Sequence, residues 1–383
     1  MRDKKKIAYV TGTRADFGLM TPVLRAIEKS EKLSLAVFAT GMHLMSEFGA
    51  TMHEVEELFP RAKRIEAVFE TDNRKGMATF AGTLFPKVVS IFSKERPDFV
   101  LLLGDRVEML AVAVACLYLG IPTGHLHGGE RTATVDEVAR HAISKLSSLH
   151  FPATADSAGR LKRMGEEEWR IHIVGAPALD TIVNEKLPTR GELCERLKIN
   201  PSQKFILVVQ HAVSEEADRA GEQMRGTLAA VASFNLPVVV MYPNADAGGR
   251  RMIAEIEKRK NNPLFRLFPS VPHTMFLALE RDAAVLVGNS SGALIESASF
   301  RTPVVNVGTR QNGRVRGGNV IDVGYSRDEI RAAIEKSLYD KAHLTGLRRV
   351  KNPWGDGKTA GRVVKVLERL PKKERLLAKQ IVY

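Results

Sequence analysis

The sequence predicts an α/β protein with two Rossmann-like, doubly wound domains, each built on a parallel sheet. Short apolar runs rich in β-branched residues alternate with longer runs of helical period, which is the pattern of a parallel sheet covered by helices. A polar segment at about residues 184–203 interrupts this alternation, and the pattern then restarts. At 383 residues the chain is long enough for each half to bury its own core.

In the first half, predicted strands and helices alternate along most of the chain. The predicted strands are 6–11, 33–40, 99–103 and 123–127. The predicted helices are 20–29, 42–57, 77–94 and 107–119. A further helix is expected at 135–147, followed by strands around 149–153 and 170–174.

The second half repeats this order. Its predicted strands are 205–210, 238–242, 265–268, 284–287 and 304–307, and its predicted helices are 215–234, 248–260, 273–279 and 292–300. We therefore expect domains at 1–180 and 181–358, with a C-terminal helix within 359–383 that packs back onto the first domain. Because such domains bind ligands at the carboxyl ends of their strands, the active site is predicted in the cleft between them.

Composition and charge exclude several classes of function. No apolar run approaches the roughly 18–20 residues of a membrane span, and the first apolar stretch stops at Gly12, which predicts a cytoplasmic protein with no membrane partner. Cys116 and Cys194 offer neither a disulfide framework nor metal-ligand spacing. The net charge of +13 is scattered, and the basic clusters contain no interleaved aromatic residues, so a nucleic-acid partner is not expected.

The first motif is the segment 11–18, TGTRADFG, directly after the first predicted strand. Its small residues let backbone N–H groups approach an anion, and Arg14 can contact a phosphate through two nitrogens. It is neither GxGxxG nor a Walker loop, which argues against a dinucleotide cofactor and against ATP. The alternative is an ordinary turn with Asp16 as a helix cap.

Two further motifs follow strands of the second half. Segment 288–292, GNSSG, opens a predicted helix, where Ser290 and Ser291 can bind an anion and Glu296 can accept hydrogen bonds from ribose hydroxyls. Segment 308–319 carries Arg310, Arg314 and Arg316, which suit a pyrophosphate clamp. Simple serine capping and a solvated basic loop are the respective alternatives.

A fourth group of side chains suits acid and base catalysis. Asp105, Glu130 and His211 each follow a predicted strand, with Arg106 and Asp136 nearby. Carboxylates together with an imidazole allow an acid and a base to act on opposite faces of a substrate. His125 and His127 fit either this group or the core. These side chains are also possible metal ligands, but the chain has no HExxH helix and no Cys/His cluster, so no metal is expected.

Eight motifs in this order resemble one family, the hydrolysing UDP-N-acetylglucosamine 2-epimerases of sialic-acid and related nonulosonate biosynthesis. They are TGTRADFG, GDRVE, HLHGGE, TVDEVARHAISKLSSLHF, VGAPALD, PNADAGG, GNSSGALIESASF and VNVGTRQNGRVRGGNV. The resemblance extends from about residue 6 to about residue 352. It implies a GT-B-like pair of Rossmann domains, no cofactor, and a homodimer or homotetramer.

The resemblance also implies roles for individual residues. The catalytic group around the sugar would comprise Asp105, Arg106, Glu130, Asp136 and His211. The residues that bind UDP would be Arg14, Ala15, Asn244, His273, Ser290, Ser291, Gly292, Glu296 and Arg310. We expect Asp105 and Glu130 to be the acid/base pair, with Asp136 as a helper.

The implied reaction converts UDP-N-acetylglucosamine and water to N-acetylmannosamine and UDP through a 2-acetamidoglucal. Departure of UDP gives C1 cationic character, which lets a carboxylate remove the C2 proton. The same chemistry on UDP-2,4-diacetamido-2,4,6-trideoxyglucose is an alternative, because Leu103 stands where the family frequently has histidine and makes the pocket more apolar. A non-hydrolysing 2-epimerase, a GT-B glycosyltransferase and a noncatalytic UDP-sugar sensor are further alternatives. Arg106 favours the hydrolysing branch.

Overall fold

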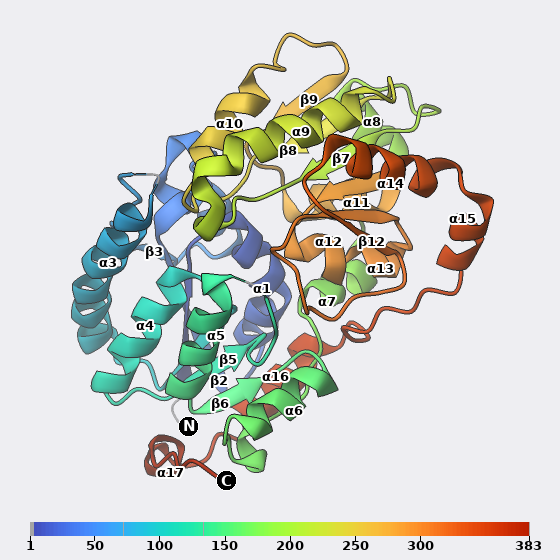
Figure 1. Cartoon of the computed structure of the whole chain (residues 1–383). Helices are drawn as coiled ribbons and strands as arrows, with labels where there is room; N and C mark the ends of the chain where they lie inside the picture. Colours follow the sequence, from blue (N-terminus) through green and yellow to red (C-terminus); the bar gives the residue numbers. More distant parts are fainter. Residues whose placement is uncertain (1–3, 72, 133, 383) are drawn as a thin grey trace.

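The computed structural model describes residues 4–71, 73–132 and 134–382. They form two α/β units that lie against each other, one from the first half of the chain and one from the second (Figure 1). Each unit contains one parallel six-stranded sheet with helices on both faces. The predicted fold class is therefore confirmed.

The first sheet has the strand order β3-β2-β1-β4-β5-β6, and all its strands are parallel. Its strands are β1 (Lys5–Thr11), β2 (Leu33–Ala39), β3 (Lys63–Arg64), β4 (Phe99–Leu103), β5 (Thr123–Leu126) and β6 (Leu149–Phe151). This is the strand order of a dinucleotide-binding Rossmann sheet, in which the chain reverses direction across the sheet between β1 and β4.

The second sheet repeats this topology in the order β12-β11-β10-β7-β8-β9. Its strands are β7 (Ile206–Val209), β8 (Val238–Met241), β9 (Phe265–Phe268), β10 (Val285–Gly288), β11 (Val304–Val307) and β12 (Val320–Val323). Here the reversal lies between β7 and β10. The two reversal points, where such sheets bind ligands, hold the chain segments after β1, β4, β7 and β10.

Apolar side chains alternate along the strands and bury both faces of each sheet. Along β1, Tyr9 faces the core shared with helices α1 (Arg14–Glu28) and α16 (Thr359–Leu367). Val10 faces the opposite core, which is covered by the helices α3 (Arg74–Glu95), α4 (Val107–Tyr118) and α5 (Val135–Leu146). This two-residue period is what a strand buried on both faces requires.

The second sheet is covered in the same way. One face packs against α9 (Ala220–Ala232), α10 (Gly249–Glu257) and α14 (Arg327–Tyr339). The other packs against α8 (Arg190–Leu197), α11 (His273–Asp282) and α12 (Ser291–Ile295). The remaining helices are α2 (Met52–Leu58), α6 (Ala155–Arg163), α7 (Ala178–Asn184), α13 (Ser297–Phe300), α15 (Lys341–Leu347) and α17 (Lys373–Leu377), with short 3₁₀ turns η1 (Gly41–Leu44), η2 (Ser46–Phe48), η3 (Glu168–Arg170) and η4 (Ser214–Arg219).

Local sequence explains why α1 begins earlier than predicted. Thr13 and Asp16 form a reciprocal capping box, so the helix starts at Arg14 rather than near residue 20. The cap places Arg14 in the first helical turn, immediately beyond the carboxyl end of β1. The apolar period that predicted the helix begins only later, which is why the pattern missed its first turn.

Four predicted elements are wrong in detail. The helix expected at 215–234 is the 3₁₀ turn η4 followed by α9, with non-helical backbone at Glu216. The helix expected at 42–57 is instead η1, η2 and α2, because Gly49 and Ala50 take left-handed φ values of 94° and 44°. The strand expected at 170–174 is an isolated bridge between Ile171 and His150. The helix expected at 292–300 is divided at Glu296 into α12 and α13.

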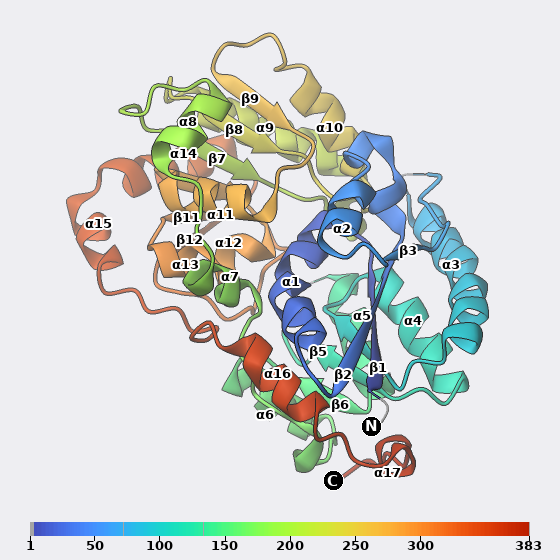
Figure 2. The ribbon, with the colours of Figure 1, turned by 180° about the vertical axis from the view of Figure 1, so that it is seen from behind.

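The C-terminal helix α16 returns to the first sheet, where it lies beside α1 (Figure 2). Val363 and Leu367 belong to the same core as β1 and α1. Asp180 anchors this return, because its two carboxylate oxygens accept hydrogen bonds from the N–H groups of Thr359 and Ala360 at 2.8 and 2.7 Å. The domain limits 1–180 and 181–358 stay a prediction.

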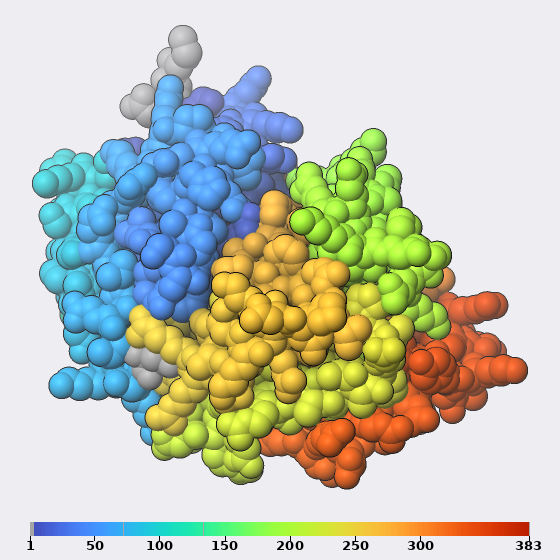
Figure 3. Space-filling view, turned by 90° about the horizontal axis from the view of Figure 1, so that it is seen from above, coloured from blue at the N-terminus to red at the C-terminus, as the bar shows by residue number. Residues whose placement is uncertain are grey.

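Seen from above, the two halves meet along a continuous boundary between first-half and second-half residues (Figure 3). Helices in the described part of the chain are all too short or too polar to cross a membrane.

Candidate active site

Two adjoining cavities lie between the halves, at the reversal points of both sheets. We call the first the serine cavity, because Ser270, Ser290 and Ser291 line it. The second, which we call the carboxylate cavity, is lined by Asp105, Asp136 and Asp246.

All nine residues expected to bind UDP line the serine cavity. They are Arg14, Ala15, Asn244, His273, Ser290, Ser291, Gly292, Glu296 and Arg310. Arg14 and Ala15 come from the first half of the chain, and the other seven come from the second. The cavity therefore forms only when the two sheets face each other.

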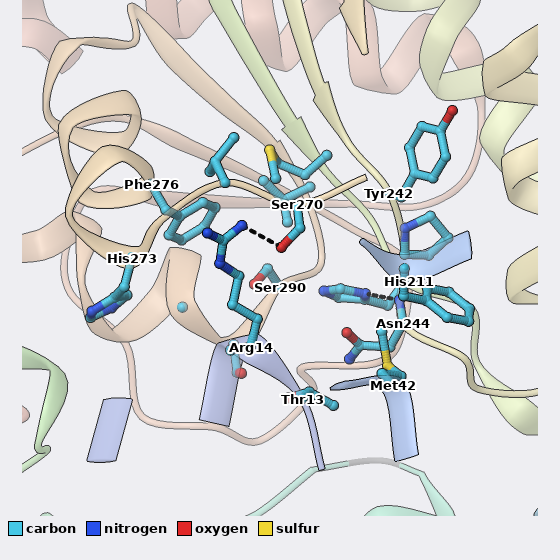
Figure 4. Close-up of a pocket in the computed structure, with 18 of the residues that line it drawn as sticks. Thr13, Arg14, Met42, His211, Tyr242, Asn244, Ser270, His273, Phe276 and Ser290 are labelled. Atoms are coloured by element: carbon cyan, nitrogen blue, oxygen red, sulfur yellow. Dashed lines mark hydrogen bonds between the residues drawn. The ribbon is translucent and has the colours of Figure 1, made fainter. Parts of the chain in front are cut away.

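Arg14 crosses the serine cavity between the two halves (Figure 4). Its Nη1 donates a hydrogen bond of 2.7 Å to Ser270 Oγ, and its Nη2 forms an ion pair with Glu54 of α2. Burial lowers the pKa of Arg14, although Glu54 raises it. Because an arginine keeps its charge even when its pKa is lowered, Arg14 presents a cation to this cavity.

His211 enters the serine cavity at the end of β7, as a neutral donor. Its Nδ1 accepts the backbone N–H of Asn244 at 3.1 Å, so the ring proton lies on Nε2 (Figure 4). Burial, reinforced by the nearby charge of Arg310, lowers the pKa of His211 to about 3. Asn289 fixes the backbone of His211 through two hydrogen bonds, at 2.7 and 3.0 Å.

The turn after β10 requires glycine at position 288. Gly288 has φ 138°, and a Cβ there would lie 2.1 Å from the carbonyl oxygen of Val209. This close approach brings Ser290 beside the end of β7 and starts α12 in the cavity wall. Arg310 reaches the same turn, because its Nη1 donates to the carbonyl oxygen of Asn289 at 3.3 Å.

Glu296 lies at the junction of α12 and α13, where its carboxylate faces the serine cavity. His273 Nε2 lies 3.3 Å from Glu296 Oε1. His273 is the first residue of α11, and Gly18 lies so close that a Cβ there would be 2.7 Å from the His273 side chain. The first half of the chain therefore packs directly against this side of the cavity.

Four aspartates line the carboxylate cavity, Asp16, Asp105, Asp136 and Asp246, and the last three each lie beside an arginine. Asp105 forms an ion pair with Arg140 of α5, and Asp246 lies 3.6 Å from Arg106. Asp136 Oδ2 lies 3.7 Å from Arg310, which is one of the residues that line both cavities. Burial raises the pKa of Asp136, while Arg310 lowers it.

Glu130 lies elsewhere than expected. It is 2% exposed and is absent from the described walls of both cavities. One oxygen pairs with His127 Nδ1, and the other accepts a 2.6 Å hydrogen bond from Arg314. Burial would raise the pKa of Glu130, but the charges of His127 and Arg314 outweigh it and lower the pKa. Glu130 thus contacts His127, Arg314 and Arg140, which line the carboxylate cavity, and its expected catalytic role stays a prediction.

The two histidines of HLHGGE have different positions. His125 is a core residue, with Nδ1 3.0 Å from Ser144 Oγ and Nε2 2.7 Å from the carbonyl oxygen of Gly104. Burial lowers the pKa of His125 to about 3. His127 instead lines the carboxylate cavity, from a left-handed backbone with φ 59°.

The arginine clamp predicted in segment 308–319 is only partly present. Arg310 and Arg314 line the carboxylate cavity. Arg316 instead pairs with Asp322 and donates to the carbonyl oxygens of Gln311 and Arg314, so it holds the loop in shape. The loop turns at residues 309–314, which directs its arginines to different sides.

Several cavity residues escaped the sequence reasoning. Tyr242 and Ser270 line the serine cavity directly after β8 and β9, as does Phe276 from α11, and Asp246 lines the carboxylate cavity. Tyr242 and Ser270 lie at or just beyond the ends of predicted strands, so a search for polar and aromatic side chains at the end of every strand would have found both. Asp246 lies within the quoted motif PNADAGG, but nothing in its spacing marked it as a cavity residue.

The fold and the two cavities define a class: a two-domain α/β protein with a nucleotide-binding type of cleft at paired reversal points. A family model described as UDP-N-acetylglucosamine 2-epimerase matches residues 25–368. The chain therefore belongs to the UDP-N-acetylglucosamine 2-epimerase family, which confirms the resemblance read from its motifs, and it is an enzyme of that family.

Individual relatives cover almost the whole chain. It is 41% identical to a UDP-N,N'-diacetylbacillosamine 2-epimerase (hydrolyzing) of Legionella pneumophila, over 99% of this chain and 100% of the relative. It is 33% identical to a UDP-N-acetylglucosamine 2-epimerase of Neisseria meningitidis, over 87% of each chain. The solved UDP-GlcNAc 2-epimerase of Methanocaldococcus jannaschii, in complex with UDP-GlcNAc and UDP, has the same fold, with a TM-score of 0.79 and 22% identity over 95% of this chain and 100% of that chain.

Proposed function

We propose that this chain is a hydrolysing 2-epimerase that converts a UDP-linked 2-acetamido sugar and water to UDP and the free C2-epimeric sugar. The observation that carries the proposal is the pair of adjoining cavities, one lined by the nine candidate UDP residues and the other by four aspartates. Arg310 lines both, which is where a pyrophosphate between uridine and sugar would lie.

UDP would occupy the serine cavity. Arg14 and Arg310 would bind the phosphates, and the N–H groups at the start of α12 would add donors there. Glu296 would accept hydrogen bonds from the ribose hydroxyls. The neutral Nε2–H of His211 would donate to the leaving phosphate, because a neutral imidazole with a fixed tautomer is a donor that costs no rearrangement.

The sugar would occupy the carboxylate cavity, where Asp105 is the candidate base. Asp105 is ion-paired with Arg140, which stabilises its ionised form. As the C1–O bond breaks, its electrons leave with UDP, the C2 proton passes to Asp105, and the C2–H electrons form the C1–C2 double bond of a glycal. Each arginine or histidine donor on the leaving group supplies about 3 kcal/mol of transition-state stabilisation.

The diacetamido sugar is the better-supported substrate. N,N'-diacetylbacillosamine is the 2,4-diacetamido-2,4,6-trideoxy sugar, with a methyl group at C6 and an acetamido group at C4. Leu103, Met77 and Ile295 line the carboxylate cavity and offer apolar contacts to these methyl groups. The relative that acts on this sugar nucleotide is also more similar to this chain than the relative that acts on UDP-N-acetylglucosamine.

UDP-N-acetylglucosamine is the second candidate substrate. It presents the same C1, C2 and UDP groups to the aspartates and arginines. Its C4 and C6 hydroxyls would face the apolar side chains, where each unpaired hydroxyl would cost about 1–3 kcal/mol. We therefore expect it to turn over with a lower kcat/KM.

Proton NMR in D2O with EDTA present tests the proposal on each sugar nucleotide separately. The expected products are UDP and the free C2 epimer with deuterium at C2. A UDP-linked epimer would place the chain among non-hydrolysing epimerases, and transfer of the sugar to an added acceptor would make it a glycosyltransferase. A protein that binds both nucleotides without changing either would be a sensor, and loss of turnover in EDTA would contradict the expected absence of a metal.

The expected cytoplasmic location belongs to the same proposal. Its support is that Cys116 and Cys194 are buried and unpaired, as is usual in a reducing compartment.

A further inference from the structure

Glu130 does not line the described walls of the carboxylate cavity, so another group there must deliver the proton to C2, and the candidates are Asp16, Asp136 and His127. Inversion at C2 needs one group to remove a proton and a second group to deliver one from the other face. Asp105 fills the first role in the proposed function. The second group must line the carboxylate cavity and carry a proton that it can give up.

His127 meets both conditions. It follows β5 directly and lines the carboxylate cavity, while its Nδ1 is held by Glu130. Within the described part of the chain, Nε2 has no hydrogen-bond partner, so it is free for a ligand. An imidazole with Nδ1 on a buried carboxylate and Nε2 free is oriented for proton transfer, because the carboxylate fixes the tautomer and stabilises the imidazolium.

The surroundings hold this ring in place. The Trp354 ring lies beside it with a centroid distance of 6.2 Å. Arg314 bonds the second oxygen of Glu130 and lies over Trp354 at 5.9 Å. The φ of 59° at His127 is uncommon for a residue with a side chain, and such backbone conformations concentrate where a side chain must be aimed.

Arg140 keeps His127 and Asp105 apart. Its Nη2 pairs with Asp105, and its Nη1 lies 3.6 Å from Glu130 on the other side of the guanidinium. One rigid group therefore fixes the separation between the base and the carboxylate that holds His127.

We propose that His127 is a catalytic residue that delivers the proton to C2 in the second half-reaction, and that Glu130 is its positioning residue. The inference rests on the proposed function. The electrons of the C1–C2 double bond take the proton from Nε2 and form the new C2–H bond. Water adds its oxygen to C1 and releases a proton to solvent, from which the neutral imidazole is reprotonated, while Asp105 returns its own proton to solvent.

His127→Asn is the sharpest test. Asparagine keeps an N–H that can reach Glu130 and tolerates the left-handed backbone, but it carries no acid at the Nε2 position. We expect UDP release to continue while protonation at C2 slows by about 100-fold or more. NMR should then show UDP together with the accumulating glycal, identified by its vinylic proton, in place of the epimeric sugar. A purely structural defect would not divide the reaction in this way.

Three further variants complete the experiment. Glu130→Gln should also accumulate glycal, because the imidazolium loses its counter-charge. Asp105→Asn should release neither UDP nor glycal. His141→Gln, a histidine of α5 that pairs with Glu137 at 3.7 Å, should keep wild-type products. UDP affinity and Tm of each variant are measured in parallel, with His127→Gln as the replacement if the asparagine variant does not fold.

The outcomes separate this inference from the proposed function. A wild-type protein that forms neither UDP nor epimer from either sugar nucleotide overturns the function itself. An active wild type with an unimpaired His127→Asn variant overturns only the role of His127. A folded, UDP-binding His127→Asn variant that no longer releases UDP also overturns it, because His127 would then act before the glycal forms.

Discussion

At the residue scale, the serine cavity combines a charged arginine with a histidine held neutral. Arg14 presents a guanidinium whose partners come from both halves of the chain, Ser270 and Glu54. His211 is kept neutral by burial and by the backbone N–H of Asn244. In the proposed function they would give a leaving pyrophosphate one cationic and one neutral donor, in a site where fixed donors need no rearrangement.

Replacing Arg14 with methionine should weaken UDP binding by about 10- to 100-fold. This corresponds to about 1.5–3 kcal/mol, the contribution of a hydrogen bond to a charged group. Isothermal titration calorimetry with UDP measures the loss. Arg25→Met provides the matched control, because Arg25 lies on the same helix but pairs with Glu185. Equal affinities for both variants would remove Arg14 from the UDP site.

A second residue-scale prediction concerns acid stability at His125. The pKa of about 3 in the folded protein lies below the ordinary 6.5, so the stabilisation is complete above pH 6.5 and is lost as the pH falls toward 3. Between these pH values the unfolded chain binds a proton at His125, and the folded protein does not. Between pH 6.5 and 5 this costs about 2 kcal/mol.

Urea denaturation at pH 7.5 and pH 5 checks this prediction. His125→Gln should be less stable at pH 7.5, because it loses the bonds to Ser144 and Gly104, yet its stability should decline less toward pH 5. The exposed His53, replaced by glutamine, should leave the full decline in place. A His125→Gln variant with an unchanged decline would mean that His125 is protonated in the folded protein.

At the element scale, the site depends on where helices begin relative to strand ends. The capping box of Thr13 and Asp16 starts α1 at Arg14, and the close approach at Gly288 places Ser290 beside β7. At the other end of the chain, α16 packs on α1 and closes the core of the first sheet. A helix contributed from the far end of the sequence therefore supports the helix that carries Arg14.

Leu367→Ala in α16 should destabilise the first unit by about 2–5 kcal/mol, since Leu367 is fully buried against β1 and α1. Hydrogen exchange followed by mass spectrometry should show faster exchange in the strands of the first sheet than in those of the second. Leu344→Ala, a partly exposed leucine of α15, should change little. Faster exchange confined to the second sheet would contradict the predicted domain assignment of residues 359–383.

At the scale of the whole molecule, a ligand that fills the serine cavity contacts both sheets at once. UDP at 100 times its Kd should therefore stabilise the protein by about 2.7 kcal/mol and raise its Tm by about 3–5 °C. Differential scanning fluorimetry measures the shift, and uridine, which lacks the phosphates, should give a smaller one. Equal shifts would mean that the arginines do not contribute to binding.

The assembly state is a second prediction at this scale. We expect a homodimer or a homotetramer, with two or four times the 42.3 kDa mass of the single chain. Light scattering coupled to size-exclusion chromatography distinguishes these masses from that of a monomer.

Much of this protein was predictable from sequence, because the period of buried side chains and the residues at strand ends are local properties. The alternation of apolar runs predicted five of the six strands of each sheet and missed only the edge strands β3 and β12. The motifs and the family resemblance supplied nine of the residues that line the serine cavity, from the segments after β1, β8, β9, β10 and β11. Segments with weak periodicity were not predicted, among them α14 and α15. The segment 42–57 was predicted as one helix, but the left-handed residues Gly49 and Ala50 interrupt it.

The sequence by itself determined the fold class, the family and the edge of each sheet that carries the site. Only the tertiary structure decided which side chain at that edge faces the ligand. Glu130 and His127 are three residues apart, and the sequence favoured Glu130. His127 has a left-handed backbone, and its imidazole lines the cavity. The Glu130 carboxylate instead accepts a hydrogen bond from Arg314 of the second half of the chain. That choice depends on contacts between residues 184 positions apart, which no local pattern encodes.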